Sequence, residues 1–454
     1  MSILLTMLDG LAHETTTLAS VGLLAGGIDD LLVDAVYWSG RLAGRHRPVA
    51  VDTLPTTDAS VIAVFIAAWD ESAVIGAMLR TAIARFGDDP GYRLFVGTYP
   101  NDPATIAAVE AVGDARVRLV VNPRPGPTTK ADCLNRLWDA LVTDETAGGW
   151  QARAVVLHDA EDVVHRDELR VYRAYLTDHG VVQIPVLPLV DRGSRWVSGH
   201  YIDEFAYAHG MGLVARNTLG ASMPLAGVGC AIDRDILATI AARRGGEPFD
   251  ASSLTEDYEL GLMIDAMGAR QAFARVADSD GGLVAVREYF PARFGEAVRQ
   301  KARWMTGIAL SGWDRMGWGR ALDWGEHWMR MRDRRGPLAV IVLFAAWLAL
   351  VCWGLTLPAH WLAGEPWPPL DPMLGLLLTI NGWLFFWRLA TRAWCTGRHY
   401  GVAEALRSMP RVFVGNVIAI AAMRHALDRY RATLRGAPAR WDKTAHRFPE
   451  ATTR

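Results

Sequence analysis

Cysteine is scarce in this chain of 454 residues, and so is lysine. The four cysteines are Cys133, Cys230, Cys352 and Cys395. They are too few and too widely spaced for a disulfide framework or a cysteine-rich zinc site. The only lysines are Lys130, Lys301 and Lys443, so arginine carries nearly all of the positive charge. We attribute this bias to codon composition, and each lysine gains interest as a candidate site residue.

An excess of charge of either sign is also absent, since 47 basic and 49 acidic residues give a net charge of −2. A dedicated nucleic-acid binder would be basic overall, so nucleic acid is not an expected partner. The chain has no GxxxxGK[ST] or GxGxxG motif, which excludes the common nucleotidase and dehydrogenase signatures. A hydrophobic content of 51% excludes a disordered chain, and the length allows two or three domains.

Long hydrophobic runs are present in the last third of the chain. Pro337 to Leu357 is 21 residues without a charge, and Pro372 to Trp387 gives 16 more. The first is long enough to cross about 30 Å of hydrocarbon. Thirteen of the 18 tryptophans lie from Trp304 onward, as expected of a region at membrane interfaces. We predict two membrane-spanning helices rather than a buried soluble hairpin.

Two further apolar segments are less clear. Thr15 to Ile28 is followed by Asp29, Asp30 and Asp34, and a spanning helix whose carboxylates face other helices is favoured over an interfacial helix. Val412 to Met423 has only 12 residues between two arginines, and we predict a re-entrant or interfacial helix. The expected number of spans is therefore three.

Loop charges predict the orientation of these spans. Residues 1–14 and 358–371 contain no Lys or Arg. Arginines are frequent in the other flanks, namely Arg41, Arg45 and Arg47, then Arg330, Arg332, Arg334 and Arg335, then Arg388, Arg392, Arg398, Arg407 and Arg411. The positive-inside rule therefore places the N-terminus outside, and it places residues 41–335 and the basic C-terminal tail in the cytosol.

The intervening region alternates short β-branched runs with helical stretches. The expected strands are 61–67, 94–97, 117–121 and 154–157, and the expected helices lie near 71–86, 103–112 and 130–142. This rhythm predicts a Rossmann-like, doubly wound parallel sheet. Ligands of such sheets bind beyond the carboxyl ends of the strands, so the residues that follow each strand are the first candidates.

Acidic residues follow the fourth predicted strand. Asp159, Glu161 and Asp162 lie on one turn, where three carboxylates suit Mg²⁺ or Mn²⁺ holding a phosphate. A solvated acidic turn is an equally acceptable interpretation of this segment alone. Asp70, Glu71 and Asp102 follow the first two strands and are candidate ligand contacts.

Two later motifs fall on predicted helices. Glu256 and Asp257 start one helix, where they either complement its dipole or provide a general base. Gln300, Arg303 and Trp304 share one face of another helix by their i, i+3, i+4 spacing. Amide, guanidinium and indole together can hold a diphosphate and a sugar ring. An amphipathic helix at the membrane surface is the alternative interpretation.

The order DAED, TED and QxxRW before membrane helices is more specific than any one motif. It resembles the family 2 glycosyltransferases, in particular the processive membrane synthases of the cellulose- and hyaluronan-synthase type. The resemblance covers roughly residues 60–320 and the helices that follow. It rests on GTYPND at 97–102, GPTTKADCLN at 126–135, HDAEDVV at 158–164, TEDYELG at 255–261, QKARWMTGI at 300–308 and WDKTAHRFP at 441–449.

The resemblance implies a GT-A-like domain and a role for each motif. Asp102 and Lys130 would contact the nucleotide, and Asp159 with Glu161 would hold the metal. Asp257 would deprotonate the acceptor hydroxyl. Gln300, Arg303 and Trp304 would cradle the diphosphate and the end of the acceptor. Gly227 and Gly229 lie in the region where such synthases line the acceptor site. Glu161 stands where the family has a second Asp, and the region of Gly227 and Gly229 matches only loosely.

The sequence therefore predicts an inverting glycosyltransferase of the bacterial inner membrane that uses a nucleotide sugar, most plausibly UDP-linked, to build an envelope or exopolysaccharide. Single-sugar transfer to a lipid phosphate and a non-catalytic subunit of an envelope complex are the alternatives. The expected partners are a nucleotide-sugar donor, a carbohydrate acceptor, the lipid bilayer and an export partner in the outer envelope. The expected division is 1–50, an N-terminal membrane helix; 51–325, the GT-A-like domain; 326–411, a transmembrane pair; and 412–454, the last helix and tail.

Overall fold

The computed structural model describes residues 2–55, 58–437 and 446–449. Its centre is a seven-stranded sheet of order β4-β3-β2-β5-β7-β6-β8. The strands are β2 Ile62–Ala67, β3 Tyr92–Thr98, β4 Val117–Val121, β5 Ala154–Asp159, β6 Val181–Gln183, β7 Cys230–Asp233 and β8 Gln271–Phe273. The four predicted strands are all present and pair in parallel, and β7 runs antiparallel to β5 and β6. A smaller sheet pairs β1 Val49–Ala50 with β9 Val276–Ala277.

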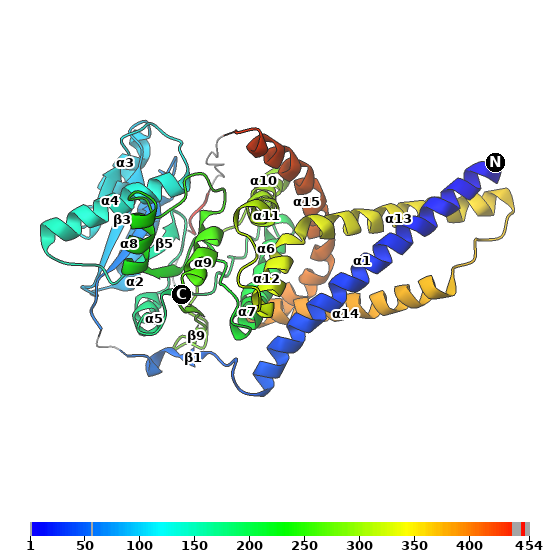
Figure 1. Ribbon diagram of the computed structural model, residues 1–454, viewed down its shortest axis with the longest axis horizontal. Coiled ribbons are helices and arrows are strands. Elements are labelled where there is room, and N and C mark those ends of the chain that lie inside the picture. The colour runs from blue at the N-terminus through cyan, green and yellow to red at the C-terminus, as the bar shows by residue number, and fades with distance from the viewer. Residues whose placement is uncertain (1, 56–57, 438–445, 450–454) are drawn as a thin grey trace.

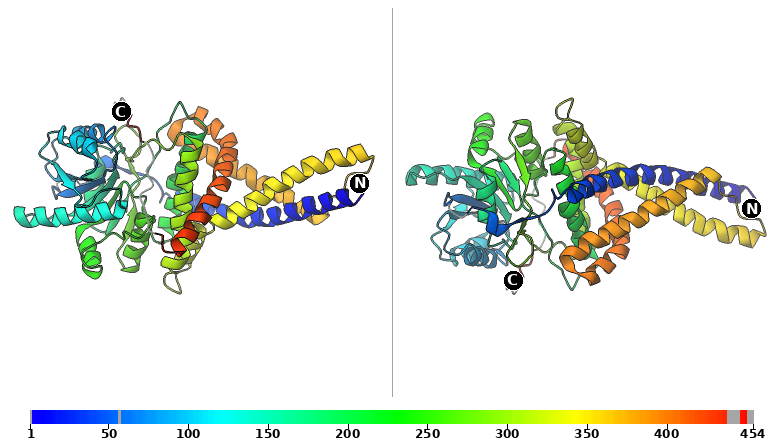
Figure 2. Two further views of the ribbon diagram at one scale, coloured as in Figure 1. Left: turned by 90° about the horizontal axis from the view of Figure 1, so that it is seen from above. Right: turned by 90° about the horizontal axis from the view of Figure 1, so that it is seen from below.

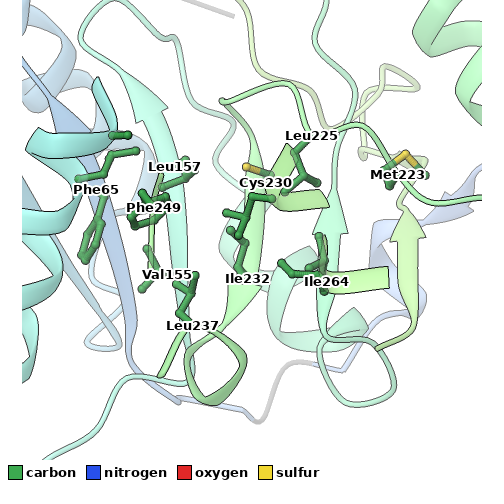
Figure 3. Packing of buried hydrophobic residues seen from close by; sticks show 14 of the residues in the cluster. Phe65, Val155, Leu157, Met223, Leu225, Cys230, Ile232, Leu237, Phe249 and Ile264 are labelled. Carbon is green, nitrogen blue, oxygen red and sulfur yellow. The ribbon is translucent and has the colours of Figure 1, made fainter. Parts of the chain in front are cut away.

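Helices cover both faces of the large sheet, as the alternating pattern predicted. Every residue of β2 is buried. Phe65 packs on one side with Val155 and Leu157 (Figure 3) and with α4 Lys130–Gly148. Its neighbours on the other side of the strand pack against α2 Ile75–Phe86. The apolar residues of β2 alternate between the two faces, so helices pack on both sides of the sheet. This packing fixes the positions of the strands, and their carboxyl ends lie along one edge of the sheet.

The remaining elements lie around this core and toward the long helices (Figure 1). They are η1 Val51–Thr53, α3 Pro103–Glu110, α5 Glu168–Tyr175, α6 Val197–Tyr207, α7 Leu213–Thr218, α8 Arg234–Arg243, α9 Glu256–Ala266, α10 Phe294–Trp304, α11 Ser311–Arg315 and α12 Trp324–Arg334. Two π-helices, η2 Ala208–Gly212 and η3 Met305–Leu310, follow α6 and α10 directly. The long helices are α1 Ser2–Leu42, α13 Gly336–Ala363, α14 Pro372–Tyr400 and α15 Val402–Leu434.

Three C-terminal helices, α13, α14 and α15, are long and apolar enough to cross a membrane. α1 packs along α13 and α14, and these three extend together away from the sheet domain (Figures 1 and 2). α15 instead runs across their base, in contact with α6 and α10.

The acids of α1 have the partners that a buried carboxylate requires. Arg332 and Arg335 ion-pair with Asp29 and Asp30, with 2.6 Å from Arg335 Nη2 to Asp30 Oδ1. Asp34 accepts hydrogen bonds from the hydroxyl of Tyr207 at 2.8 Å and from the indole of Trp387 at 2.9 Å. The carboxylates therefore face other helices, as the sequence predicted.

The predicted boundary between residues 411 and 412 is wrong, because it falls inside one helix, α15, that starts at Val402. Arg411 made the apolar segment look short, but its side chain is fully buried. Its guanidinium lies 2.8 Å from Asp203 of α6 and 2.8 Å from Glu404. A carboxylate distant in the sequence therefore neutralises the charge of this arginine. The periodicity of the sequence does not reveal such a contact.

We expect Arg411→Ala to lower the free energy of unfolding by about 3–5 kcal/mol, because it removes the fully buried cation that pairs with both Asp203 and Glu404. Arg407→Ala is the matched control: Arg407 also pairs with Glu404, but 36% of its side chain is exposed. That variant should lose less than about 1 kcal/mol. Denaturant unfolding of the detergent-solubilised protein measures both, and equal losses would contradict the assigned role of Arg411.

Candidate active site

A cavity of about 340 Å³ opens beyond the carboxyl ends of β2 and β5. Nine of the predicted site residues line it, namely Glu71, Lys130, Asp159, Glu161, Glu256, Asp257, Gln300, Arg303 and Trp304. They come from segments up to 233 residues apart in the chain. The fold therefore brings the DAED, TED and QxxRW motifs to one place.

Lys130 links two of these segments. It is the first residue of α4, whose N-cap Thr129 accepts a hydrogen bond from the backbone N–H of Asp132. Its Nζ donates to Asp159 Oδ1 at 2.5 Å and to the carbonyl of Gly227 at 3.2 Å. Burial works against ionisation of Asp159, but the ammonium of Lys130 holds the pKa of that carboxyl below its usual value. Asp159 is thus an anion beside the cavity.

Asp162 does not line the cavity, and its assignment as a metal ligand stays a prediction. Its Oδ2 accepts from His158 Nδ1 at 2.7 Å and from the backbone N–H of Asp159 at 3.0 Å. His158 Nε2 lies 2.9 Å from Glu168. Burial opposes its charge, yet these two carboxylates raise the pKa of His158 to about 10. Asp162 therefore holds the turn from inside the protein.

A cluster suited to a cation forms around Glu161 instead. Glu71 and Glu161 offer carboxylate oxygens, His446 offers a ring nitrogen, and the three ligand atoms lie within 4.8 Å of one another. His446 Nδ1 is 2.8 Å from Glu71, and its Nε2 is 3.2 Å from Glu161. The second oxygen of Glu161 is buried and has no hydrogen-bond partner within the described ranges. This donor set fits a hard divalent cation.

His446 is a residue that the sequence analysis missed. It lies in the WDKTAHRFP motif, to which no role was assigned. The next residue, Arg447, ion-pairs with Asp191 and lies over the ring of Tyr289, and Phe448 packs against the apolar cluster below β2. These contacts hold the C-terminal segment over the cavity. The signal in the sequence that could have identified this residue was a histidine among the positively charged residues of the motif.

Glu256 and Asp257 start α9 and face the cavity, as predicted for a catalytic pair. Asp257 accepts a hydrogen bond at 2.8 Å from the backbone N–H of Tyr258. Burial raises the pKa of Asp257, and burial with the charge of Asp257 raises the pKa of Glu256 to about 7. A carboxylate whose pKa lies nearer to neutrality is a better proton acceptor for an alcohol.

The i, i+3, i+4 face of α10 is present as predicted. Gln300, Arg303 and Trp304 all line the cavity, and Gln300 Oε1 is buried with no partner in the described part of the chain. Trp304 lies in an aromatic group with Tyr201, Phe205 and Phe290, at centroid distances of 6.0–6.5 Å. The guanidinium of Arg303 and the indole of Trp304 therefore face the same cavity.

Four predicted binding residues do not line the cavity. Asp102 caps α3, and its Oδ2 accepts from the backbone N–H of Asp70 at 2.6 Å. Asp70 has a φ of 54°, a left-handed conformation that is strained for a residue other than glycine. Gly227 does touch the site, since a Cβ there would lie 2.6 Å from Asp257 Oδ2. A Cβ at Gly229 would instead meet Val286 and Ile184, and its role at the acceptor site stays a prediction.

Other polar residues of the lining were not expected from the sequence. They are Glu204, His209, Glu288 and Arg299. Burial, together with the neighbouring carboxylates of Asp162 and Glu161, raises the pKa of Glu288 well above its usual value. The lining holds more carboxyl groups than Lys and Arg side chains. A phosphate ligand would therefore need a bound cation to offset this charge.

Residues 59–307 match the family model described as "Glycosyltransferase like family 2". Bacteriophage adsorption protein B of Escherichia coli (strain K12) and bacteriophage N4 adsorption protein B of Escherichia coli O157:H7 are each 35% identical over 478 residues. The alignments cover 98% of this chain, which spans 63% of the length of these curated relatives.

A solved structure shares the fold. The mannosyltransferase PcManGT from Pyrobaculum calidifontis, in complex with GDP-Man and Mn²⁺, has a TM-score of 0.51 and 18% identity, and the match covers 87% of this chain and 99% of that chain. The likeness shows a GT-A-like fold, as predicted, and at this identity it shows the fold alone.

Proposed function

The chain belongs to the glycosyltransferase-like family 2, and from that premise we propose that it transfers a sugar from a nucleotide sugar to an acceptor hydroxyl with inversion. The observation that carries this proposal is the meeting of Asp159, Asp257 and Arg303 in one cavity. Asp159 would provide negative charge for a metal, Asp257 a general base, and Arg303 a guanidinium that stabilises the leaving group.

The reaction uses these side chains in a single displacement. The acceptor oxygen attacks the anomeric carbon and its proton passes to Asp257, while the bond from that carbon to the phosphate oxygen breaks. The electron pair leaves with the nucleoside diphosphate, whose added charge Arg303 stabilises. A retaining mechanism would need a second carboxylate as nucleophile, and the displacement proposed here needs only the base.

A divalent cation, Mg²⁺ or Mn²⁺, is part of this proposal, and the complex of PcManGT with Mn²⁺ is consistent with it. Glu161 would hold the cation together with Glu71 and His446 of the same group of donors, and Asp159 lines the same cavity. When bound, the cation supplies positive charge that offsets the diphosphate. Asp70 and Asp102, beyond β2 and β3, are proposed to lie near the nucleotide, and Lys130 to contact it.

We propose that the product is an envelope or exopolysaccharide of the bacterial inner membrane, built from a UDP-linked sugar. The QxxRW face of α10 supports chain growth over single transfer, because it presents an indole to the cavity that also holds the proposed base. Membranes that contain the chain should release nucleotide from one of a panel of nucleotide sugars and form a product of many sugars. A product of one sugar on a lipid would favour transfer to a lipid phosphate, and release from none would favour a non-catalytic role.

The membrane arrangement is also a proposal. α1, α13 and α14 would cross the bilayer, and α15 would lie along the cytosolic surface, which its direction across their base supports. The division 1–50, 51–325 and 326 onward follows, with the last helix beginning at Val402. The sheet domain and C-terminus would be cytosolic, the N-terminus outside, and an export partner would meet the outer ends of the helices.

Cysteine labelling tests this topology, in a background where the native cysteines are replaced. A cysteine at Ala363 should react with an impermeant thiol reagent in intact cells, because residues 358–371 would lie outside. Cysteines at Met331 and Thr444 should react only after permeabilisation. Labelling of Thr444→Cys in intact cells would show that α15 crosses the membrane and would overturn the three-span arrangement.

A further inference from the structure

The cavity has a second wall that carries, besides Arg303, residues to which the proposed donor site assigns no role. Strand β5 ends at Asp159, two residues before Glu161, and a nucleotide is expected at this carboxyl edge of the parallel strands β2, β3 and β5. The opposite wall comes from α6, η2, α10 and η3, of which α6, α10 and η3 pack against α15. The acceptor must occupy the part of the cavity that the donor does not fill, so its sugar would bind against this wall.

This wall combines aromatic rings with polar side chains, among them Glu204, His209 and Arg299. Phe205 lies 4.7 Å from Phe290 and 6.2 Å from Trp304, measured between ring centroids. The ring of His209 stacks on Phe205 at 5.2 Å with an interplanar angle of 10°. Binding sites of small polar molecules often have this composition, in which apolar walls give contact area and a few polar atoms fix the orientation.

The hydrogen bonding of His209 determines which polar atom it can offer. The backbone N–H of Val186 donates to His209 Nδ1 at 3.2 Å, so Nδ1 is an acceptor and carries no proton. The neutral ring then has its proton on Nε2. Nε2 has no hydrogen-bond partner within residues 2–55, 58–437 and 446–449, and His209 lines the cavity. Burial lowers the pKa of His209 to about 3, so the ring stays neutral at physiological pH.

The local backbone supports a binding role for this residue. Ala208 and His209 open the π-helix η2, which interrupts an otherwise regular helix, and Ile308 of the second π-helix, η3, lies on the same cavity wall. π-Helical turns are rare and frequently occur at functional sites. Other roles fit less well: a ring with a pKa near 3 is a poor base, and His209 is not in the cation-binding cluster.

We propose that His209 is an acceptor-binding residue, whose Nε2–H donates a hydrogen bond to an oxygen of the acceptor saccharide packed against Phe205 and Trp304. The proposal rests on the proposed glycosyltransferase function. It assigns specificity for the acceptor to η2, while leaving the metal, the base and the diphosphate contacts as described above.

Two substitutions separate this role from a structural one. In His209→Asn the side-chain oxygen can still accept from the N–H of Val186, but no group reaches the position of Nε2. In His209→Gln the longer amide can place an N–H near that position, but the bond to Val186 is lost. A role in acceptor binding needs an N–H at the position of Nε2, so His209→Gln should be more active than His209→Asn. A structural role needs an acceptor for the N–H of Val186, so the order of activity should be the reverse.

The assay uses membranes that contain the full chain and a radiolabelled nucleotide sugar that the wild-type chain cleaves. It compares sugar transferred to larger products with sugar set free by water. We expect the ratio of transfer to hydrolysis to fall about tenfold in His209→Asn, the effect of one lost hydrogen bond, and to stay within about threefold of wild type in His209→Gln. The reverse order would overturn the proposal. Absence of nucleotide release from every donor in the wild-type chain would instead overturn the proposed function.

A measurement on the wild-type chain covers the case in which a variant fails to fold. Diethyl pyrocarbonate modifies neutral imidazole, and mass spectrometry locates the modified histidine. Membranes that have synthesised product should show His209 protected, compared with membranes that received no nucleotide sugar. Equal modification of His209 in the two samples would overturn the proposal, and His327, which does not line the cavity, is the internal control.

Discussion

Asp257→Asn is expected to lower the rate of sugar transfer by about 10²–10⁴-fold, the usual contribution of a general base. The amide has nearly the same shape, and it can still accept the hydrogen bond that the N–H of Tyr258 donates at 2.8 Å. The fold and the binding of the nucleotide should therefore survive. Initial rates of nucleotide release measure the loss, with circular dichroism as the check on folding.

The matched control for this variant is Asp265→Asn, which removes a carboxylate from the same helix. Asp265 does not line the cavity, so its loss should leave the rate within about twofold of wild type if Asp257 acts through proton transfer. Near-wild-type turnover of folded Asp257→Asn would remove this residue from the mechanism.

The pH dependence of the rate follows from the same assignment. Because burial raises the pKa of Asp257, the active anion forms at a higher pH than for an ordinary aspartate. The rate should therefore fall with decreasing pH at a higher pH than the protonation of an exposed Asp would require. A rate that stays flat until the pH at which an exposed Asp is protonated would contradict the assignment of Asp257 as the base.

Removal of the metal is expected to stop the reaction, and Mg²⁺ or Mn²⁺ should restore it. His446→Ala should raise the Mn²⁺ concentration that gives half-maximal activity by roughly 10- to 100-fold, because it removes a nitrogen from the cluster with Glu71 and Glu161. Asp159→Ala should weaken metal-dependent nucleotide binding. Titration of nucleotide release with Mn²⁺ after treatment with EDTA gives these values.

Arg447→Ala is the control for His446, because it loosens the same segment without removing a ligand atom. Equal shifts in both variants would mean that His446 only docks the segment. Asp162→Ala should leave the Mn²⁺ requirement unchanged but lower the melting temperature, since it leaves His158 with one fewer partner. A raised Mn²⁺ requirement in Asp162→Ala would restore the ligand set that the sequence suggested.

The sheet and three of the motifs could be predicted because their signals are local. β-Branched runs predicted β2 to β5, and helical spacing put Gln300, Arg303 and Trp304 on one face. The likeness to family 2 glycosyltransferases is confirmed by the family match over residues 59–307. Each of these features depends on neighbours in the sequence.

The features that could not be predicted depend on distant contacts. Arg411 looks like the end of an apolar segment until Asp203 of α6 is placed beside it. Asp162 looks like a metal ligand until His158 turns it inward. His446 lies 285 positions after Glu161, and only the fold brings the two together.

The most direct test of the account is the structure of the full chain with Mn²⁺ and UDP. The account predicts that Mn²⁺ is coordinated by Glu161, that the diphosphate lies between the cation and Arg303, and that the nucleotide follows the carboxyl ends of β2, β3 and β5. A nucleotide bound outside this cavity, or a diphosphate-bound Mn²⁺ without Glu161 among its ligands, would contradict it.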